Sequence, residues 1–104
     1  MKLSICTDVM GALSFTDMLD QCVELGVEGV EMTGGGWSPA PHFRADELLA
    51  DKALLKQKLH EIKVRGLQIA ALNCSGNPLD PGVLGSRHRR EIDDTIRLAG
   101  EIGV

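Results

Sequence analysis

Three side chains that could bind a polyhydroxylated molecule directly follow a strand-like segment. Asn73, Cys74 and Ser75 come after residues 67–72, which alternate in the manner of a β-strand. An amide and a hydroxyl both donate and accept hydrogen bonds, so they suit sugar hydroxyls. Cys74 is the cysteine placed where chemistry could occur, and a packed structural thiol is the alternative. The residues that follow, Gly76 and Asn77-Pro78, predict a turn, and any ligand contact would be in addition to that turn.

Glu31 and Trp37 are a second pair of candidates. Glu31 is an acid in the otherwise apolar strand-like segment 27–32. It could bind a sugar hydroxyl or orient a catalytic group, and the alternative is a carboxylate that faces water or a lysine. Trp37 follows three consecutive glycines and could stack on a sugar, or simply pack in its loop. The glycine run matches neither the dinucleotide fingerprint nor the phosphate loop of nucleotide-binding enzymes.

The remaining titratable residues predict no catalytic centre. His88 and Glu91 are spaced i, i+3, but a metal site needs more donors, so we expect a solvated helix face there. The basic run 87–90 could meet an anionic substrate or a carboxylate from another part of the protein. No Ser-His-Asp or Cys-His arrangement can be assembled. We therefore name neither a catalytic residue nor a metal ligand.

Alternating strand and helix patterns must position these residues. Apolar spacing and capping signals predict a helix that starts after Ser14 and ends at Gly26, and a last helix that Gly103 ends. The predicted strands are residues 3–7, 27–32 and 67–72, the predicted loops are 34–41 and 73–85, and the other predicted helices are 46–49 and 51–65. On the strands we expect Leu3, Ile5, Val30, Met32, Ile69 and Ala71 to pack under helices, and Ser4, Cys6, Asp8, Gly29, Glu31, Thr33, Ala70, Leu72 and Cys74 to face the opposite side.

One junction recurs along the chain and predicts the fold class. Leu25-Gly26-Val27, Arg65-Gly66-Leu67 and Ile102-Gly103-Val104 are spaced by 40 and 37 residues. Such a βα period implies parallel strands joined by crossover helices. Because three parallel strands leave their edges uncovered, we interpret residues 1–104 as an incomplete domain. It would be the first three βα units of a (β/α)8 TIM barrel, in which eight units need about 300 residues. A small open α/β domain with associated copies is the alternative.

Composition and charge narrow the function classes. The net charge is −4 and aromatic residues are 3% of the chain, which disfavours nucleic-acid binding. No apolar run approaches the roughly 20 residues of a membrane span. The strand pattern starts directly after Met1 with no signal peptide, so we expect the cytoplasm. The three cysteines lack metal-site spacing and are expected to be free thiols.

The chain resembles the sugar phosphate isomerase/epimerase family, the xylose isomerase-like TIM barrels. Residues 2–8, 25–31 and 67–79 carry the resemblance, most distinctively Asn-Cys-Ser-Gly-Asn-Pro after the Gly-Gly-Trp loop. The resemblance implies a sugar or sugar phosphate as substrate and a divalent metal, manganese or zinc, in the intact enzyme. The family's metal ligands and catalytic glutamates lie on later strands, so none is transferred to this chain. The matching positions near the substrate pocket are Glu31, Trp37, Asn73, Cys74 and Ser75.

Other functions remain open at this point. The same barrel superfamily contains endonuclease IV-like repair enzymes, which the charge of −4 disfavours, and inosose dehydratases. A hypothesis from a different functional class is a non-catalytic α/β module that self-associates through exposed strand edges. For the isomerase reading we expect the 104-residue chain alone to be inactive and to bind no metal.

Overall fold

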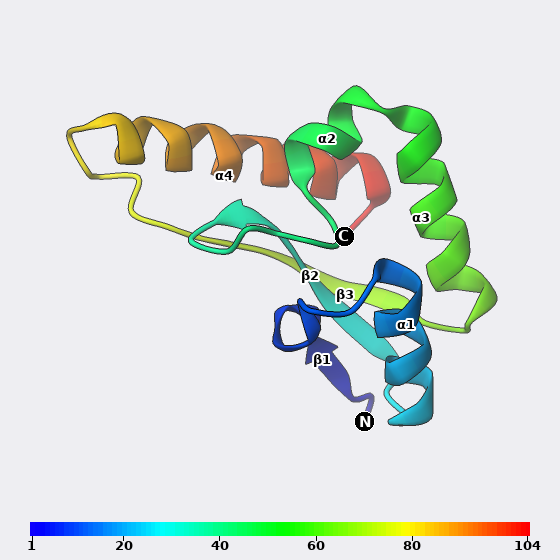
Figure 1. Cartoon of the computed structure of the whole chain (residues 1–104). Helices are drawn as coiled ribbons and strands as arrows, with labels where there is room; N and C mark the ends of the chain where they lie inside the picture. Colours follow the sequence, from blue (N-terminus) through cyan, green and yellow to red (C-terminus); the bar gives the residue numbers. More distant parts are fainter.

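Strands and helices alternate along the chain in a computed structural model that describes all 104 residues (Figure 1). None of the helices combines the length and apolar composition that a bilayer crossing needs. The elements are β1 (Ser4–Cys6), the 3-10 helix η1 (Thr7–Met10), α1 (Phe15–Glu24), β2 (Gly29–Gly36), α2 (Ala45–Ala50), α3 (Lys52–Val64), β3 (Gln68–Ser75) and α4 (Val83–Ile102).

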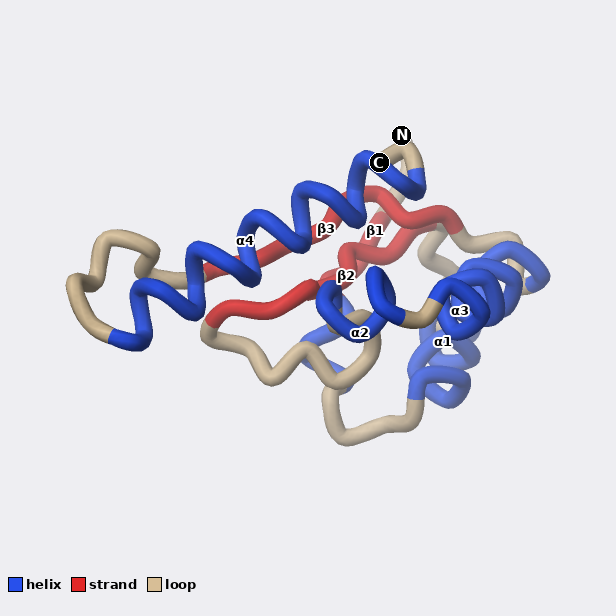
Figure 2. The backbone as a smooth tube through the Cα atoms, turned by 90° about the horizontal axis from the view of Figure 1, so that it is seen from above, coloured by secondary structure: helices blue, strands red, loops and turns tan.

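The three strands form one parallel sheet in the order β1-β2-β3. A single hydrophobic core joins Val30 and Met32 of β2 to α1, α2, α3 and α4. Figure 2 shows α4 running alongside β3 and α1 beside α3. The parallel α/β class predicted from the repeated junctions is therefore confirmed, and the outer edges of β1 and β3 are unpaired.

The predicted ends of the first three helices and the end of the last one are confirmed, but the predicted loop 73–85 is too long, because β3 continues through Ser75 and α4 already begins at Val83. The Ser14 hydroxyl accepts a hydrogen bond of 3.1 Å from the Asp17 N–H and caps α1. The Asp51 carboxylate does the same for α3, at 3.0 Å from the Leu54 N–H. The three junction glycines all lie in the left-handed region, with φ of 74°, 72° and 76° at positions 26, 66 and 103. Glycine adopts this conformation without the Cβ clash of other residues.

The glycine run is part of a strand, which corrects the prediction of a loop at 34–41. β2 continues through Gly36, and α4 packs directly over its end. A Cβ at Gly34 would lie 2.4 Å from Thr95 Oγ1, and one at Gly35 would lie 3.1 Å from Glu91 Cβ. The glycines therefore let a helix approach the strand backbone, which the sequence alone does not distinguish from loop flexibility.

A register shift also corrects part of the predicted strand faces. Val30 pairs with Ile69, but Glu31 pairs with Ala71, so Ala70 is an extra residue. One extra residue moves the following side chains of β3 to the opposite face. Leu72 packs against the core, and Cys74 lies beside α4, so neither faces away from the helices as predicted.

The buried face of α4 differs from the predicted one. His88 has 0% of its surface exposed and Glu91 has 9%, whereas Ile96 of the expected apolar stripe is 65% exposed. The expectation of a solvated face at His88 and Glu91 is therefore wrong. The glycines of β2 leave room for these larger polar side chains, and polar partners from other segments surround them.

Candidate functional site

A row of hydrogen-bonded polar side chains runs from Glu31 of β2 to the last residues of β3. The Asn73 amide donates to Glu31 Oε1 at 3.1 Å, and the Ser75 hydroxyl donates to Asn73 Oδ1 at 2.9 Å. Glu31 and Asn73 are half-buried and Ser75 is exposed. The second carboxylate oxygen of Glu31 has no protein partner. The row therefore presents a free carboxylate oxygen from the third residue of β2, level with Cys6 at the end of β1, and a hydroxyl from the last residue of β3. Ligands bind outside the carboxyl ends of the strands in such folds, and Ser75 is the member of the row that lies there.

Cys74 does not belong to this row. Its side chain approaches Thr95 and Glu91 of α4, on the opposite face of β3 from Asn73. Burial raises the pKa of the Cys74 thiol, and the nearby Glu91 raises it further, while a hydrogen bond with Thr95 opposes them. A thiol with a raised pKa is a poor nucleophile near neutral pH, so the packed structural role fits Cys74 better.

Trp37 links the row to α4. Its backbone N–H donates to the Ser75 carbonyl at 2.7 Å, which fixes the start of the segment after β2 against the end of β3. The indole meets the His88 ring edge to face, with centroids 4.5 Å apart and an interplanar angle of 77°. The side chain remains 60% exposed and can offer its other surface to a ligand.

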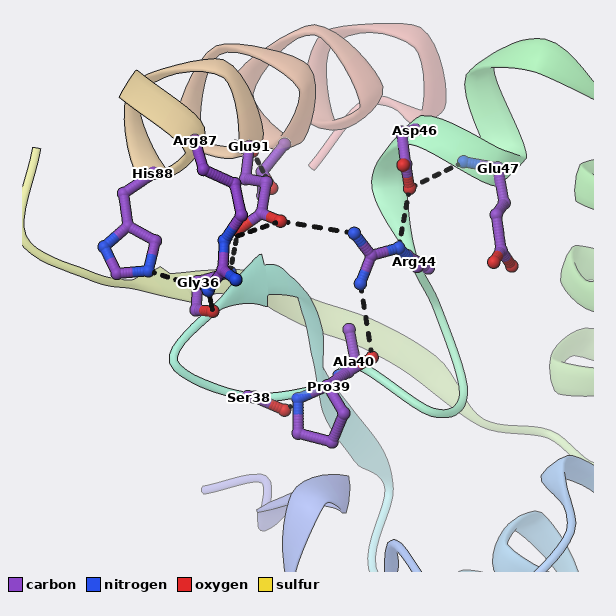
Figure 3. A network of polar contacts seen from close by, with 11 residues as sticks. Gly36, Ser38, Pro39, Ala40, Arg44, Asp46, Glu47, Arg87, His88 and Glu91 are labelled. Carbon is purple, nitrogen blue, oxygen red and sulfur yellow. Dashed lines mark hydrogen bonds and ion pairs between the residues drawn. The ribbon is translucent and has the colours of Figure 1, made fainter. Parts of the chain in front are cut away.

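A buried carboxylate, which sequence reasoning missed, holds three elements together beside Trp37. Glu91 Oε2 accepts from the Gly36 N–H at 2.7 Å, and Arg44 donates to Oε1 at 3.2 Å (Figure 3). Arg87 Nε lies 3.6 Å from the same oxygen, and the Arg87 guanidinium also donates to the Gly36 carbonyl at 3.3 Å. We call Gly36, Arg44, Arg87 and Glu91 the Glu91 cluster. The i, i+4 spacing of Arg87 and Glu91 was the only local signal for it.

The charges of the cluster are shared unequally. Arg44 contacts Asp46 at 3.0 Å as well as Glu91. Burial lowers the pKa of Arg44, but the two carboxylates outweigh this effect, so the pKa of Arg44 is raised. The closest carboxylate to Arg87 is Glu91, at 3.6 Å. A cavity of about 270 Å³ opens at this point, lined by Gly36, Trp37, Ser38, Pro39, Arg44, Arg87 and Glu91.

His88 is fixed by the turn after β3. Its Nδ1 accepts a hydrogen bond of 2.8 Å from the Asn77 N–H. A Cβ at Gly76 would lie 2.7 Å from the His88 ring, so glycine is needed for this approach. Gly76 and Asn77, which suggest an ordinary turn in the sequence, thus also position a buried histidine.

The residues present do not form a metal site. No three His, Cys, Asp or Glu side chains lie together in a way that could hold an ion. Glu91, the most buried carboxylate, is already bound by a backbone N–H and by Arg44. No metal-dependent step is derived from these residues.

The chain is similar to a bacterial protein about three times its length. No family model matches the chain. The uncharacterized protein YfiH of Bacillus subtilis (strain 168) is 52% identical over 104 residues. The match covers 100% of this chain and 33% of that protein, so the chain spans about a third of the length of this relative.

Proposed function

We propose that this chain is the first (βα)3 part of a TIM-barrel sugar or sugar phosphate isomerase or epimerase. The observation that supports this most is the hydrogen-bonded Glu31–Asn73–Ser75 row, which runs from the face of the parallel sheet to the carboxyl end of β3. The threefold greater length of the similar Bacillus protein supports a larger parent domain. The free thiols of the three cysteines agree with a reducing compartment, so the cytoplasm remains the proposed location.

In this proposal the row binds substrate and does not perform the proton transfer. The free oxygen of Glu31 accepts from one sugar hydroxyl, and the Ser75 hydroxyl meets a second. Trp37 covers the apolar face of the sugar ring or chain. The reaction takes a proton from the carbon beside the carbonyl, leaves the electron pair in an enediol, and returns a proton to the neighbouring carbon. The base and the divalent metal, manganese or zinc, would have to come from residues outside these 104.

Proton exchange tests this function directly. The full-length Bacillus relative is incubated in D2O with ketopentoses, ketohexoses and their phosphate esters, with Mn²⁺ or Zn²⁺ added. We expect one substrate to lose the NMR signal of the hydrogen beside its carbonyl and to form an isomer. The 104-residue chain under the same conditions is the control and should show neither. Absence of exchange across the panel contradicts the isomerase proposal, and exchange by the short chain contradicts the need for further residues.

Self-association is the second proposed function, and it rests on the uncovered edge of β3. A groove of about 280 Å³ lies between this strand and α4. It is largely apolar and is lined by Ala70, Ala71, Leu72, Thr95, Ile96, Ala99 and Val104. Unpaired strand edges beside apolar surface favour pairing with another copy. Light scattering tests this, because a monomer of 11.2 kDa at high concentration contradicts edge pairing, whereas Ile96→Lys should dissociate a dimer.

A further inference from the structure

We infer that the cavity beside the Glu91 cluster binds the phosphate group of a small phosphorylated molecule, held between Arg44 and Arg87. This inference deepens the proposed function. It rests on that function only for the sugar part of the ligand, not for the phosphate group. The cavity lies where the segment after β2 passes under the first turns of α4 (Figure 3). It is distinct from the Glu31–Asn73–Ser75 row, none of whose side chains lines it.

The two arginines and the carboxylates of Glu91 and Asp46 balance in formal charge, but Arg87 has no close ion-pair partner. Two guanidinium groups converge on one buried carboxylate, and Glu91 is already held by the Gly36 N–H and by Arg44. Asp46 pairs with Arg44 at 3.0 Å, has 51% of its side chain exposed and does not line the cavity. Arg87 is 49% exposed and has its closest carboxylate oxygen at 3.6 Å, beyond a close ion pair. Arg87 is therefore the cation that an incoming oxyanion can pair with.

His88 supplies a second, independent observation. Because its Nδ1 accepts from the Asn77 N–H, the proton of the neutral ring lies on Nε2. The neighbour of Nε2 is the Arg87 guanidinium at 3.2 Å, which also has only N–H groups to offer. This contact joins two donors, so a fully buried histidine N–H lacks an acceptor. An anionic oxygen that accepts from both groups requires the Arg87 guanidinium to move away from Nε2.

The arrangement of donors favours phosphate over carboxylate. Arg44 comes from the start of α2 and Arg87 from α4, and both line the cavity, whereas His88 Nε2 lies 3.2 Å behind the Arg87 guanidinium. A phosphate monoester offers three terminal oxygens in a tetrahedral arrangement, whereas a carboxylate offers two in one plane. Arg87 covers the Nε2 edge of His88, and a rotamer change of this half-exposed side chain opens that edge to the cavity.

Tryptophan fluorescence tests the inference on the chain itself. Trp37 is the single tryptophan and lines the cavity, so its emission reports occupancy directly. The chain is titrated with inorganic phosphate, ribose 5-phosphate, ribose and acetate at constant ionic strength. We expect saturable changes with phosphate and ribose 5-phosphate in the millimolar range, and none with acetate. A change with ribose would report sugar binding at the Glu31–Asn73–Ser75 row and should not depend on Arg87.

Charge variants on α4 decide whether the signal comes from this site. Arg87→Met should weaken phosphate binding by about tenfold or more, since a hydrogen bond to a charged group is lost. Arg87→Lys keeps the charge but loses the planar fork of the guanidinium. Its affinity for phosphate should lie between those of the parent and of Arg87→Met. Arg97→Met removes the same charge from a position on α4 that is 69% exposed, and should bind as the parent does. Circular dichroism establishes that each variant is folded.

The outcomes separate the site from the proposed function. If Arg87→Met and Arg97→Met weaken phosphate binding equally, the binding reflects general charge attraction, and the inference is overturned. Acetate binding as tight as phosphate binding overturns the phosphate assignment. Binding that depends on Arg87, together with no proton exchange by the full-length relative on any phosphorylated sugar, supports the site while the isomerase proposal fails.

Discussion

The carboxylate of Glu91 accepts a hydrogen bond of 2.7 Å from the backbone N–H of Gly36, although 55 residues separate the two along the chain. This contact joins the last residue of β2 to α4, and the bond from Arg44 adds the start of α2. Removing one member of such a buried group leaves its partners unpaired. The loss of folding free energy then exceeds the net contribution of the hydrogen bond itself.

Glu91→Ala is therefore expected to lower the free energy of unfolding by about 2–3 kcal/mol, because it leaves the Gly36 N–H and Arg44 without their acceptor. Glu91→Gln keeps an acceptor but not the charge and should cost about 1–2 kcal/mol. Urea denaturation measures both. Glu101→Ala on the same helix removes an exposed ion pair with Lys52 and should change stability by less than about 0.5 kcal/mol. Equal effects at positions 91 and 101 would contradict the structural role of Glu91.

Two glycines near α4 should respond to alanine with opposite signs. Gly34→Ala places a Cβ 2.4 Å from Thr95 Oγ1, and such overpacking costs about 1–3 kcal/mol. Gly100→Ala meets nothing within 4 Å on an exposed helix position and should stabilise by up to about 1 kcal/mol. Thermal unfolding of the two variants is compared. Thr95→Ala should recover part of the loss in Gly34→Ala, and a neutral Gly34→Ala would mean that α4 can move away.

Lys58 should make stability depend on pH near the alkaline limit. Its ammonium donates to the His42 carbonyl at 2.7 Å and lies 4.0 Å from the centre of the Phe15 ring. Burial lowers the pKa of Lys58 from 10.5, and Glu47 only partly opposes this. Between the lowered pKa and 10.5 the unfolded chain binds the proton that the folded chain has lost, so stability from this group rises with pH. The free energy of unfolding of the parent minus that of Lys58→Met should increase as the pH approaches 10.5. A difference that falls over this range would have the wrong sign.

Cysteine alkylation tests the assignment of Cys74 as a packed thiol. Burial raises the pKa of both Cys74 and Cys22, so each carries less thiolate than an ordinary cysteine at pH 8. We expect iodoacetamide to modify both several-fold more slowly in the folded chain than in urea, as mass spectrometry of the peptides would show. Raising the pH should speed the reaction of half-buried Cys74 more than that of buried Cys22. Rapid modification of Cys74 at neutral pH would instead make it a reactive thiol.

The sequence predicted the local features and missed the long-range ones. Ser14, Asp51 and the junction glycines act through contacts within a few residues, so their patterns were sufficient to place the helix ends. The face of Cys74 depends on the extra residue at Ala70, which leaves no local signature. The burial of Glu91 depends on Gly36 and Arg44, which approach it only after folding. Glu31 and Asn73 were predicted as candidates, but their hydrogen bond was not.

The glycine run of β2 has a consequence for any ligand that binds beside Trp37. Gly34 and Gly35 bring α4 against the strand backbone with no side chain between them, so little repacking can change this spacing. The backbone of β2 and that of α4 are thereby fixed relative to each other before a ligand arrives, so the Arg87 side chain is the part that reorients on binding. The cavity should consequently discriminate sharply between anions of different geometry. A variant that loosens this packing should bind phosphate more weakly and also discriminate less between anions.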